Sequence, residues 1–526
     1  MGSRRVWITV IVLTIILAAG SPTLLFAQTK KAPAGSAGTP SRRPTAKQPA
    51  ARDEGLQDAL VRKLKEALDS ADDVTDEDRD TANQILREAD PILTRIREEN
   101  RRALEQVNRQ VRIADGRSPN VVLFLLHDVG YGDLGCYGQK EIHTPVMDLM
   151  AARGTRFTQF YAGAPESVAS RGTLLSGRLT ARGTQVGDTW VALRKEDCTL
   201  AETLYQGGYE TGLFGVWGAG PVATAGHPHS QGFKTFYGYL DDASAADYYP
   251  ETLWQNGEQI PLSGNQGGAK AQYAPDLIVE SAKRFIDTAW KRPFFLMVAF
   301  PMAMSGDGSE VPDFGTYAGK NWPTADKVRA AMLTRVDGYI GRIVRRLCDR
   351  GLLSRTITVI TSDNGPLGAA EDRFASTAGL RGRKGELYEG GIRVPLIVHW
   401  SSCFRMDCCE CDLPFGMWDA LPTLADLTGT WHRPKGIDGV SVVRTLRGES
   451  DSGSPLPASP LYWEKHSGGW GQAVRLDNWK AVRSTAGGPW EVYDLYTDPA
   501  EAQDVAETQA EVAERANRIV EQVRPK

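Results

Sequence analysis

Short apolar segments, separated by stretches of helical periodicity, constrain the fold of this chain more than any other feature of its sequence. The clearest are residues 121–126, 212–215, 294–300, 356–361 and 394–400. Each has the length of a strand, and a continuous apolar run is typical of a strand that is buried on both faces. Helical stretches such as residues 326–349 lie between them. This alternation predicts an α/β domain over residues 118–440, in which helices sandwich a large, mostly parallel sheet.

The residues after this domain are expected to form a smaller unit. Residues 455–526 contain two strand-like pieces, at 473–474 and 480–483, and a helical stretch from Pro499. They predict a C-terminal α+β subdomain with a short antiparallel sheet.

The residues before the domain are expected to divide into a linker and a helical pair. Residues 29–52 are rich in Ala, Pro, Lys, Ser and Thr, which predicts a flexible linker. Residues 53–117 carry apolar residues at spacings of three and four, interrupted at Pro91, which predicts a helical hairpin or short coiled coil. Two interpretations stay open: its apolar stripe packs on the main domain, or it forms a homo-oligomer with Asn100 as a polar core residue.

The N-terminus predicts export. Arg4 and Arg5 precede an uncharged run over residues 6–27, which is typical of a signal peptide within residues 1–28. The run is also long enough to anchor the chain in a membrane if it is not cleaved. We therefore expect a secreted or periplasmic protein, or one anchored in a membrane and facing outside, in a compartment where disulfides persist.

Four of the seven cysteines crowd into one loop: Cys403, Cys408, Cys409 and Cys411. One or two disulfides are the simpler interpretation, although the spacing does not determine their pairing. A zinc site is the alternative, but the loop lacks a second CxxC pair.

Polar residues follow two of the predicted strands. His127 and Asp128 follow the first, and Asp363 and Asn364 follow the strand at 356–361. Ligands of such sheets bind beyond the carboxyl ends of the strands. Two carboxylates and an amide oxygen suit Ca²⁺ or Mg²⁺, so we predict a metal site at Asp128, Asp363 and Asn364, with His127 as a further candidate ligand.

A second group of residues has the chemistry of an oxyanion site. Ser167 opens an apparent helix, whose positive end stabilises an anion or a nucleophile. Arg171 lies one turn further on, and its guanidinium suits a tetrahedral oxyanion. Lys384 lies in a Gly-rich loop. The simpler interpretation is that Ser167 only caps the helix and Lys384 is solvated.

These residues lie in motifs that resemble the sulfatase family of the alkaline-phosphatase-like superfamily. The motifs are residues 119–133, 156–178, 361–366, 380–395 and 478–495. The resemblance implies that Ser167 is the position converted to formylglycine, if it is matured, and that Asp128, Asp363 and Asn364 bind calcium. It further implies that Arg171 positions the nucleophile and that Lys384 clamps the sulfate.

The same resemblance exposes several departures. The paired aspartates of the family read His127-Asp128, and the proline of its signature is Ala169. Its lysine is Val216, and its proline-histidine pair reads Ala303-Met304. Residues 244–247 also lack histidines that similar sequences carry. Since calcium prefers oxygen, the imidazole of His127 should weaken the metal site.

Three functions follow from the resemblance and its departures. The chain could be a sulfuric ester hydrolase acting on a sulfated small molecule or glycan. It could be an inactive homologue that binds a sulfated glycan or a protein partner. It could also be a phosphodiester or phosphonate hydrolase. The net charge of -4 and the lack of a basic stripe argue against nucleic acid as a partner.

Overall fold

The computed structural model describes residues 118–524, apart from 183–184, 187–188, 191–192, 302–309, 369–372, 401–408, 431–433, 435, 444–460 and 467. The predicted signal peptide, linker and helical hairpin lie outside the described residues. The same is true of Ala303, Met304, Cys403 and Cys408, and the side chain of Cys409 is not described.

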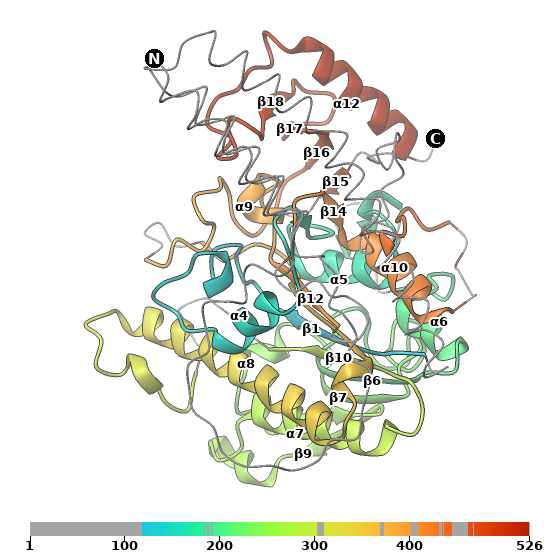
Figure 1. Cartoon of the computed structure of the whole chain (residues 1–526), viewed down its shortest axis with the longest axis vertical. Helices are drawn as coiled ribbons and strands as arrows, with labels where there is room; N and C mark the ends of the chain where they lie inside the picture. The colour runs from blue at the N-terminus through green and yellow to red at the C-terminus, as the bar shows by residue number, and fades with distance from the viewer. Residues whose placement is uncertain are drawn as a thin grey trace, which may run out of the picture. The chain divides into compact units, whose positions relative to one another are not determined.

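A ten-stranded sheet forms the centre of the described chain (Figure 1). Its order is β13 (Cys409–Cys411), β2 (Thr155–Phe157), β12 (Leu396–His399), β11 (Thr356–Ser362), β1 (Asn120–Leu126), β10 (Phe294–Ala299), β6 (Glu210–Val216), β7 (Thr235–Tyr239), β8 (Thr252–Gln255) and β9 (Glu258–Pro261). The five strands from β11 to β7 pair in parallel. The predicted parallel, helix-covered sheet is therefore confirmed.

The strand predicted at 394–400 runs in the opposite direction from its neighbour. It forms β12, which pairs antiparallel with β11 and with β2. Among the described residues of the connection from β11 to β12, the one helix is the short α9 (Glu389–Ile392). A parallel return is usually made through a crossover helix that packs on the sheet, whereas an antiparallel return needs none.

Side chains of β1 alternate between two hydrophobic cores, which explains why this strand is apolar throughout. All seven of its residues are buried. Val122, Phe124 and Leu126 face a core shared with α4 (Pro145–Ala152), α7 (Ala274–Ala289) and α8 (Thr324–Asp349).

The intervening residues of β1 face the other side of the sheet. Val121, Leu123 and Leu125 contribute to a core shared with α5 (Ser167–Ser176), α6 (Leu200–Gln206) and α10 (Ala420–Thr428). Figure 1 shows the two sets of helices on opposite sides of the sheet. Two short pairs of strands complete the domain: β3 (Phe160–Tyr161) with β14 (Phe415–Gly416), and β4 (Gln185–Val186) with β5 (Thr189–Trp190).

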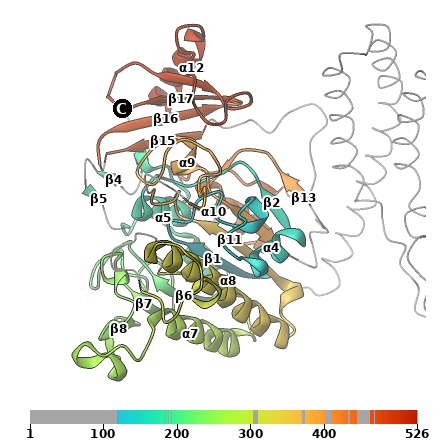
Figure 2. The same cartoon turned by 90° about the vertical axis from the view of Figure 1, so that its left-hand side faces the viewer.

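A four-stranded antiparallel sheet stands at one end of the domain with a helix packed on it (Figure 2). It consists of β15 (Leu461–Lys465), β16 (Gly471–Leu476), β17 (Trp479–Arg483) and β18 (Glu491–Asp494), covered by α12 (Ala510–Val523). The small antiparallel sheet predicted here is confirmed.

The final helix predicted from Pro499 is present, but its predicted start was wrong, because α12 begins at Ala510. The intervening chain turns instead. Glu501 has a left-handed backbone (φ 53°), which interrupts a right-handed helix. The Asp498 carboxylate accepts the N–H groups of Ala502 and Gln503, and so closes a local turn.

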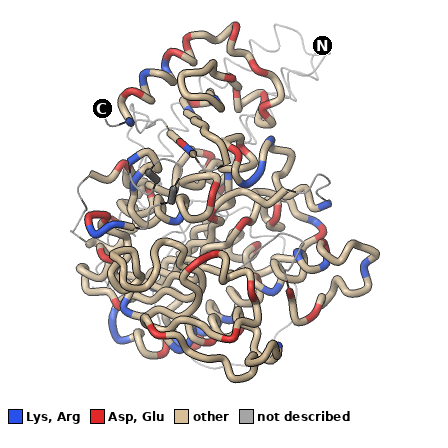
Figure 3. The backbone as a smooth tube through the Cα atoms, turned by 180° about the vertical axis from the view of Figure 1, so that it is seen from behind, with Lys and Arg blue, Asp and Glu red and all other residues tan. Residues whose placement is uncertain are grey.

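Two further observations bear on the surface. Among the described residues, no helix is long and apolar enough to cross a membrane. Basic and acidic residues are interspersed along the backbone in the view of Figure 3.

Candidate active site

The polar residues predicted at two strand ends lie side by side. β1 and β11 are parallel neighbours, and their last residues are register partners. His127 and Asp128 therefore leave the sheet beside Asp363 and Asn364. The backbone of Asp128 is left-handed (φ 57°), and its N–H donates to Oδ1 of Asp363 at 3.1 Å. This turn holds both carboxylates at the same edge of the sheet.

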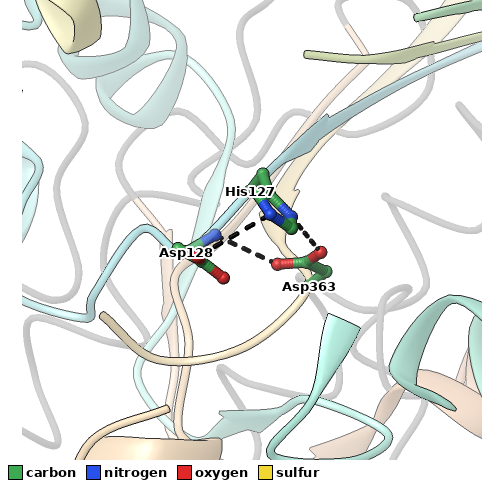
Figure 4. Close-up of side chains that lie close together, drawn as sticks. All are labelled: His127, Asp128 and Asp363. Carbon is green, nitrogen blue, oxygen red and sulfur yellow. Dashed lines mark hydrogen bonds and ion pairs between the residues drawn. The ribbon is translucent and has the colours of Figure 1, made fainter. Parts of the chain in front are cut away.

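The side chains of His127, Asp128 and Asp363 converge (Figure 4). Nδ1 of His127 lies 2.7 Å from Oδ2 of Asp363, and Nε2 lies 3.7 Å from Oδ2 of Asp128. Each residue offers one ligand atom within 4.8 Å of the others. Both carboxylates are buried, with 1% of each side chain exposed.

The contacts of this group shift two of its pKa values in opposite directions. Burial lowers the pKa of His127, but the carboxylates of Asp128 and Asp363 outweigh it and raise that pKa above its usual value. Burial likewise opposes ionisation of Asp363, yet His127, Arg171 and Lys384 hold its pKa well below the usual range. Asp363 is therefore an ionised carboxylate in a buried position.

The donor set fits a divalent cation. It offers the two carboxylates and one imidazole, with the amide of Asn364 beside them. Nδ2 of Asn364 donates to Oδ1 of Asp128 at 2.8 Å, so its Oδ1 is directed to Ser167 instead. An imidazole nitrogen in the set makes it a poorer site for calcium than oxygen ligands alone, and a better one for transition metals.

Ser167 lies next to this group, at the first residue of α5. Its Oγ donates to Oδ1 of Asn364 at 2.8 Å and lies 3.5 Å from Oδ1 of Asp128. The helix cap is Glu166, so Ser167 is not the capping residue. The hydroxyl therefore faces the candidate metal group from the positive end of a helix.

Lys384 reaches the same group from the Gly-rich loop before α9. Its Nζ lies 2.7 Å from the Asp128 carboxylate. The loop is held in place by backbone bonds from Lys384 N to Pro366 O at 2.9 Å and from Gly385 N to Pro165 O at 2.8 Å. Gly385 has a left-handed backbone (φ 86°), which explains a glycine beside the lysine.

Arg171 is buried between two carboxylates. Its Nη1 donates to Oδ2 of Asp363 at 3.2 Å, and its Nη2 lies 2.6 Å from both oxygens of Asp242. A Cβ added at Gly218 would lie 2.2 Å from Nη2, so the absence of a side chain there makes room for the guanidinium. Asp242 was not predicted as a site residue, because it lies in the loop after β7 and outside every recognised motif.

Glu166 is a second residue that the sequence interpretation missed. Its Oε2 is buried and has no hydrogen-bond partner among the described residues. Burial raises the pKa of this carboxyl to about 7, while Lys465 and Lys384 lower it. A titratable group therefore lies directly beside Ser167.

The departures read from the sequence have different structural outcomes. Val216 ends β6 as a buried member of the hydrophobic core, with 3% of its surface exposed. Residues 244–247 form the short 3₁₀ helix η3 (Ser244–Ala246) and the residue that follows it.

Three of the described cysteines, Cys136, Cys198 and Cys348, are free thiols.

A buried ionic network fixes the lysine loop to the C-terminal sheet. Nζ of Lys480 lies 2.9 Å from Oε1 of Glu389 and 2.9 Å from Oε1 of Glu501. Burial opposes ionisation of Glu389, but Lys480, Arg393 and other cations outweigh it and lower its pKa to about 2. Glu389 begins α9, so the C-terminal sheet supports the segment that carries Lys384.

Comparisons with known proteins cover the part of the chain that carries these residues. Residues 119–430 match the family model Sulfatase, and residues 383–525 match the model described as N-sulphoglucosamine sulphohydrolase, C-terminal. Arylsulfatase A of Homo sapiens is 33% identical over 424 residues, which cover 74% of this chain and 79% of that protein.

Two further matches, one curated protein and one solved structure, extend this similarity. The N-acetylgalactosamine-6-O-sulfatase of Bacteroides thetaiotaomicron is 25% identical over 506 residues, which cover 79% of this chain and 96% of that protein. The crystal structure of Ps i-CgsB in complex with k-i-k-neocarrahexaose superposes with a TM-score of 0.67 at 26% identity, and covers 77% of this chain and 92% of that one.

Proposed function

Since this chain belongs to the sulfatase family, we propose that it hydrolyses sulfate esters, with Ser167 as the precursor of its nucleophile. The observation that carries the proposal is the position of Ser167 Oγ, 2.8 Å from Asn364 and 3.5 Å from Asp128 at the start of α5. The side chain that the family oxidises therefore faces the carboxylates that would hold a metal.

His127, Asp128, Asp363 and Asn364 would hold a divalent cation, calcium or magnesium, in a site weakened by the imidazole. When bound, such an ion polarises the sulfate oxygens and offsets the charge that develops on them. The chain's own groups act around it. Lys384 orients Asp128, and Arg171 orients Asp363.

We expect slow turnover. Val216 is apolar and buried in the place of the family's lysine. Loss of one preorganised charge lowers kcat by roughly 10²–10³. The ester is proposed to belong to a sulfated small molecule or glycan, since one relative is named as an N-acetylgalactosamine-6-O-sulfatase and one similar structure is a complex with k-i-k-neocarrahexaose. A secreted, periplasmic or outward-facing anchored location agrees with such a substrate.

Mass spectrometry of the peptide that carries Ser167 tests this proposal. The full chain is produced in a host that contains the serine-type maturing enzyme, and Ser167→Ala is the matched control. We expect the wild-type peptide to lose two hydrogens, as oxidation of the hydroxyl to an aldehyde requires, and the control peptide not to. Unmodified Ser167 in that host would contradict the proposal.

A second function has its own supporting observation. The site's fixed cations, Arg171 and Lys384, are both already paired with carboxylates. In an inactive homologue that binds a sulfated glycan or a protein partner, Arg171 and Lys384 would stay paired with these carboxylates. An inactive homologue of this kind predicts that the chain is retained on an immobilised sulfated oligosaccharide without release of sulfate.

Faster turnover of an aryl phosphodiester than of an aryl sulfate would favour a phosphodiester or phosphonate hydrolase instead.

A further inference from the structure

Asp242 and Asp363 contact different terminal nitrogens of Arg171. Both of its oxygens lie 2.6 Å from Nη2, whereas Nη1 donates to Asp363 at 3.2 Å. Only 2% of the Arg171 side chain is exposed, against 31% for Asp242. Asp242 is therefore the solvent-facing partner of a buried guanidinium.

The guanidinium cannot easily leave this partner. On one side lies the backbone of Gly218, which is left-handed (φ 72°) and lies so close that a Cβ would meet Nη2 at 2.2 Å. On the other lies Asp363, itself buried. Nε of Arg171 has no hydrogen-bond partner among the described residues. Nη2 is thus the nitrogen at which an anion from solvent would arrive, and a carboxylate of the chain already fills that place.

The charges around Nη2 of Arg171 also oppose the binding of a further anion. Asp128, Asp363 and Asp242 supply three carboxylates, while Arg171 and Lys384 supply two permanent cations and His127 supplies an imidazole that is charged only when protonated. An additional oxyanion would meet repulsion from Asp242 and would have to displace it from Nη2. Carboxylate and sulfate bind the same fork of N–H donors, so they compete for one position.

We propose that Asp242 is a specificity-determining residue, which occupies the oxyanion position on Arg171 and keeps free inorganic sulfate out of the site. The inference deepens the proposed hydrolysis of sulfate esters, because it describes the same site. Free sulfate can displace Asp242 only through its charge and its hydrogen bonds to the guanidinium, which the carboxylate of Asp242 also offers. An ester also carries an organic group, whose contacts favour the exchange.

A simpler role makes the opposite prediction. If Asp242 only holds Arg171 in position, its removal leaves the guanidinium less ordered and weakens the binding of any anion. If Asp242 competes with the anion, its removal strengthens that binding. The sign of the change therefore decides between the two roles.

The experiment is calorimetric titration of the full chain, with Ser167 unmodified, with sodium sulfate at constant ionic strength. We expect Asp242→Asn to bind sulfate about tenfold more tightly than the wild type or better, because a like charge has been removed. Asp241→Asn is the matched control, since Asp241 lies in the same loop but its carboxylate accepts from Ser244 and, among the described residues, has no bond to Arg171. It should change the affinity less than twofold. Adding Arg171→Met to Asp242→Asn should abolish the gain.

Equal or weaker sulfate binding by Asp242→Asn would overturn the inference. If that variant unfolds, sulfate should restore its folding, because the anion takes the place of the lost carboxylate, and a failure of sulfate to do so also overturns it. The measurement needs no hydrolysis. If the chain hydrolyses no ester but Asp242→Asn binds sulfate more tightly, the proposed function fails and this inference stands. If the chain hydrolyses esters but Asp242→Asn does not bind sulfate more tightly, the proposed function stands and this inference fails.

Discussion

The ammonium group of Lys384 lies 2.7 Å from the carboxylate of Asp128, so a cation of the chain and a metal ion would share one ligand. The two would compete for the negative charge of Asp128 while both acting on a bound sulfate. Lys384 is therefore expected to have opposite effects on metal binding, which it weakens, and on turnover, which it supports.

Replacing Lys384→Met should therefore tighten metal binding and slow hydrolysis. Asp128 becomes fully available to the cation, whereas the sulfate loses one positive group, which lowers kcat/KM by about 10²–10³. Calorimetric titration with Ca²⁺ and Mn²⁺ measures the first effect, and a sulfate-release assay the second. Lys234→Met, which removes a surface lysine stacked on Tyr205, should change neither. Weaker metal binding by Lys384→Met would show that the lysine supports the metal site instead.

Replacing His127→Asp should increase the affinity for calcium. The substitution supplies a carboxylate where an imidazole nitrogen now lies 2.7 Å from Asp363. Because calcium prefers charged oxygen ligands, we expect its dissociation constant to fall about tenfold or more. Thermal unfolding with and without calcium measures the effect through the stabilisation that binding adds. His143→Asp, at an exposed position, is the control. An unchanged calcium response would mean that His127 lies outside the metal site.

Replacing Gly218→Ala should unfold the chain at a lower urea concentration than Gly208→Ala. Both glycines are left-handed (φ 72° and 87°), so both substitutions introduce backbone strain of roughly 1 kcal/mol. Only at Gly218 would the new Cβ meet the Arg171 guanidinium, whereas nothing lies within 4 Å at Gly208. We expect an additional loss of about 1–3 kcal/mol in the free energy of unfolding. Equal losses would contradict the position assigned to Arg171.

Replacing Glu166→Gln should remove a pH dependence of stability. Burial raises the pKa of Glu166 to about 7 in the folded chain. An unfolded glutamate titrates near about 4.3, so between these values the folded chain binds more protons and its stability falls as the pH rises.

The glutamine variant stays neutral and avoids this loss. Below about pH 4 the two proteins should be equally stable, and above about pH 7 the variant should gain on the order of 1–3 kcal/mol. Urea unfolding at a series of pH values measures the difference. Glu196→Gln, at an exposed site, is the control. A gain that does not depend on pH would show that Glu166 is not titrating in this range.

The pattern of apolar segments was sufficient to predict the central sheet, because β1 is buried on both faces and its sequence must be apolar throughout. The direction of β12 was not predictable in the same way. An apolar run records burial but not strand direction, and β12 pairs antiparallel with β11. Glu501, in the turn before α12, forms a buried ion pair with Lys480 on β17. Sequence spacing does not indicate this contact.

The candidate site was predictable where two strand ends coincide. Asp128 and Asp363 meet because β1 and β11 are neighbours, and polar residues after both strands signalled it. Asp242 gave no such signal, since an aspartate in a loop is ordinarily solvated. Its role appears only when the buried Arg171 is seen beside it. Glu166 was missed for a related reason, because burial beside Ser167 cannot be read from sequence spacing.

The rate of sulfate release from an aryl sulfate by the matured chain, compared with that of Ser167→Ala, tests most directly whether the serine beside the carboxylates carries catalysis. We expect slow but measurable release by the wild type in the presence of a divalent cation, and a loss of that release in the variant. No release by a chain whose Ser167 is shown to be oxidised, or equal release by both proteins, would contradict the proposed function.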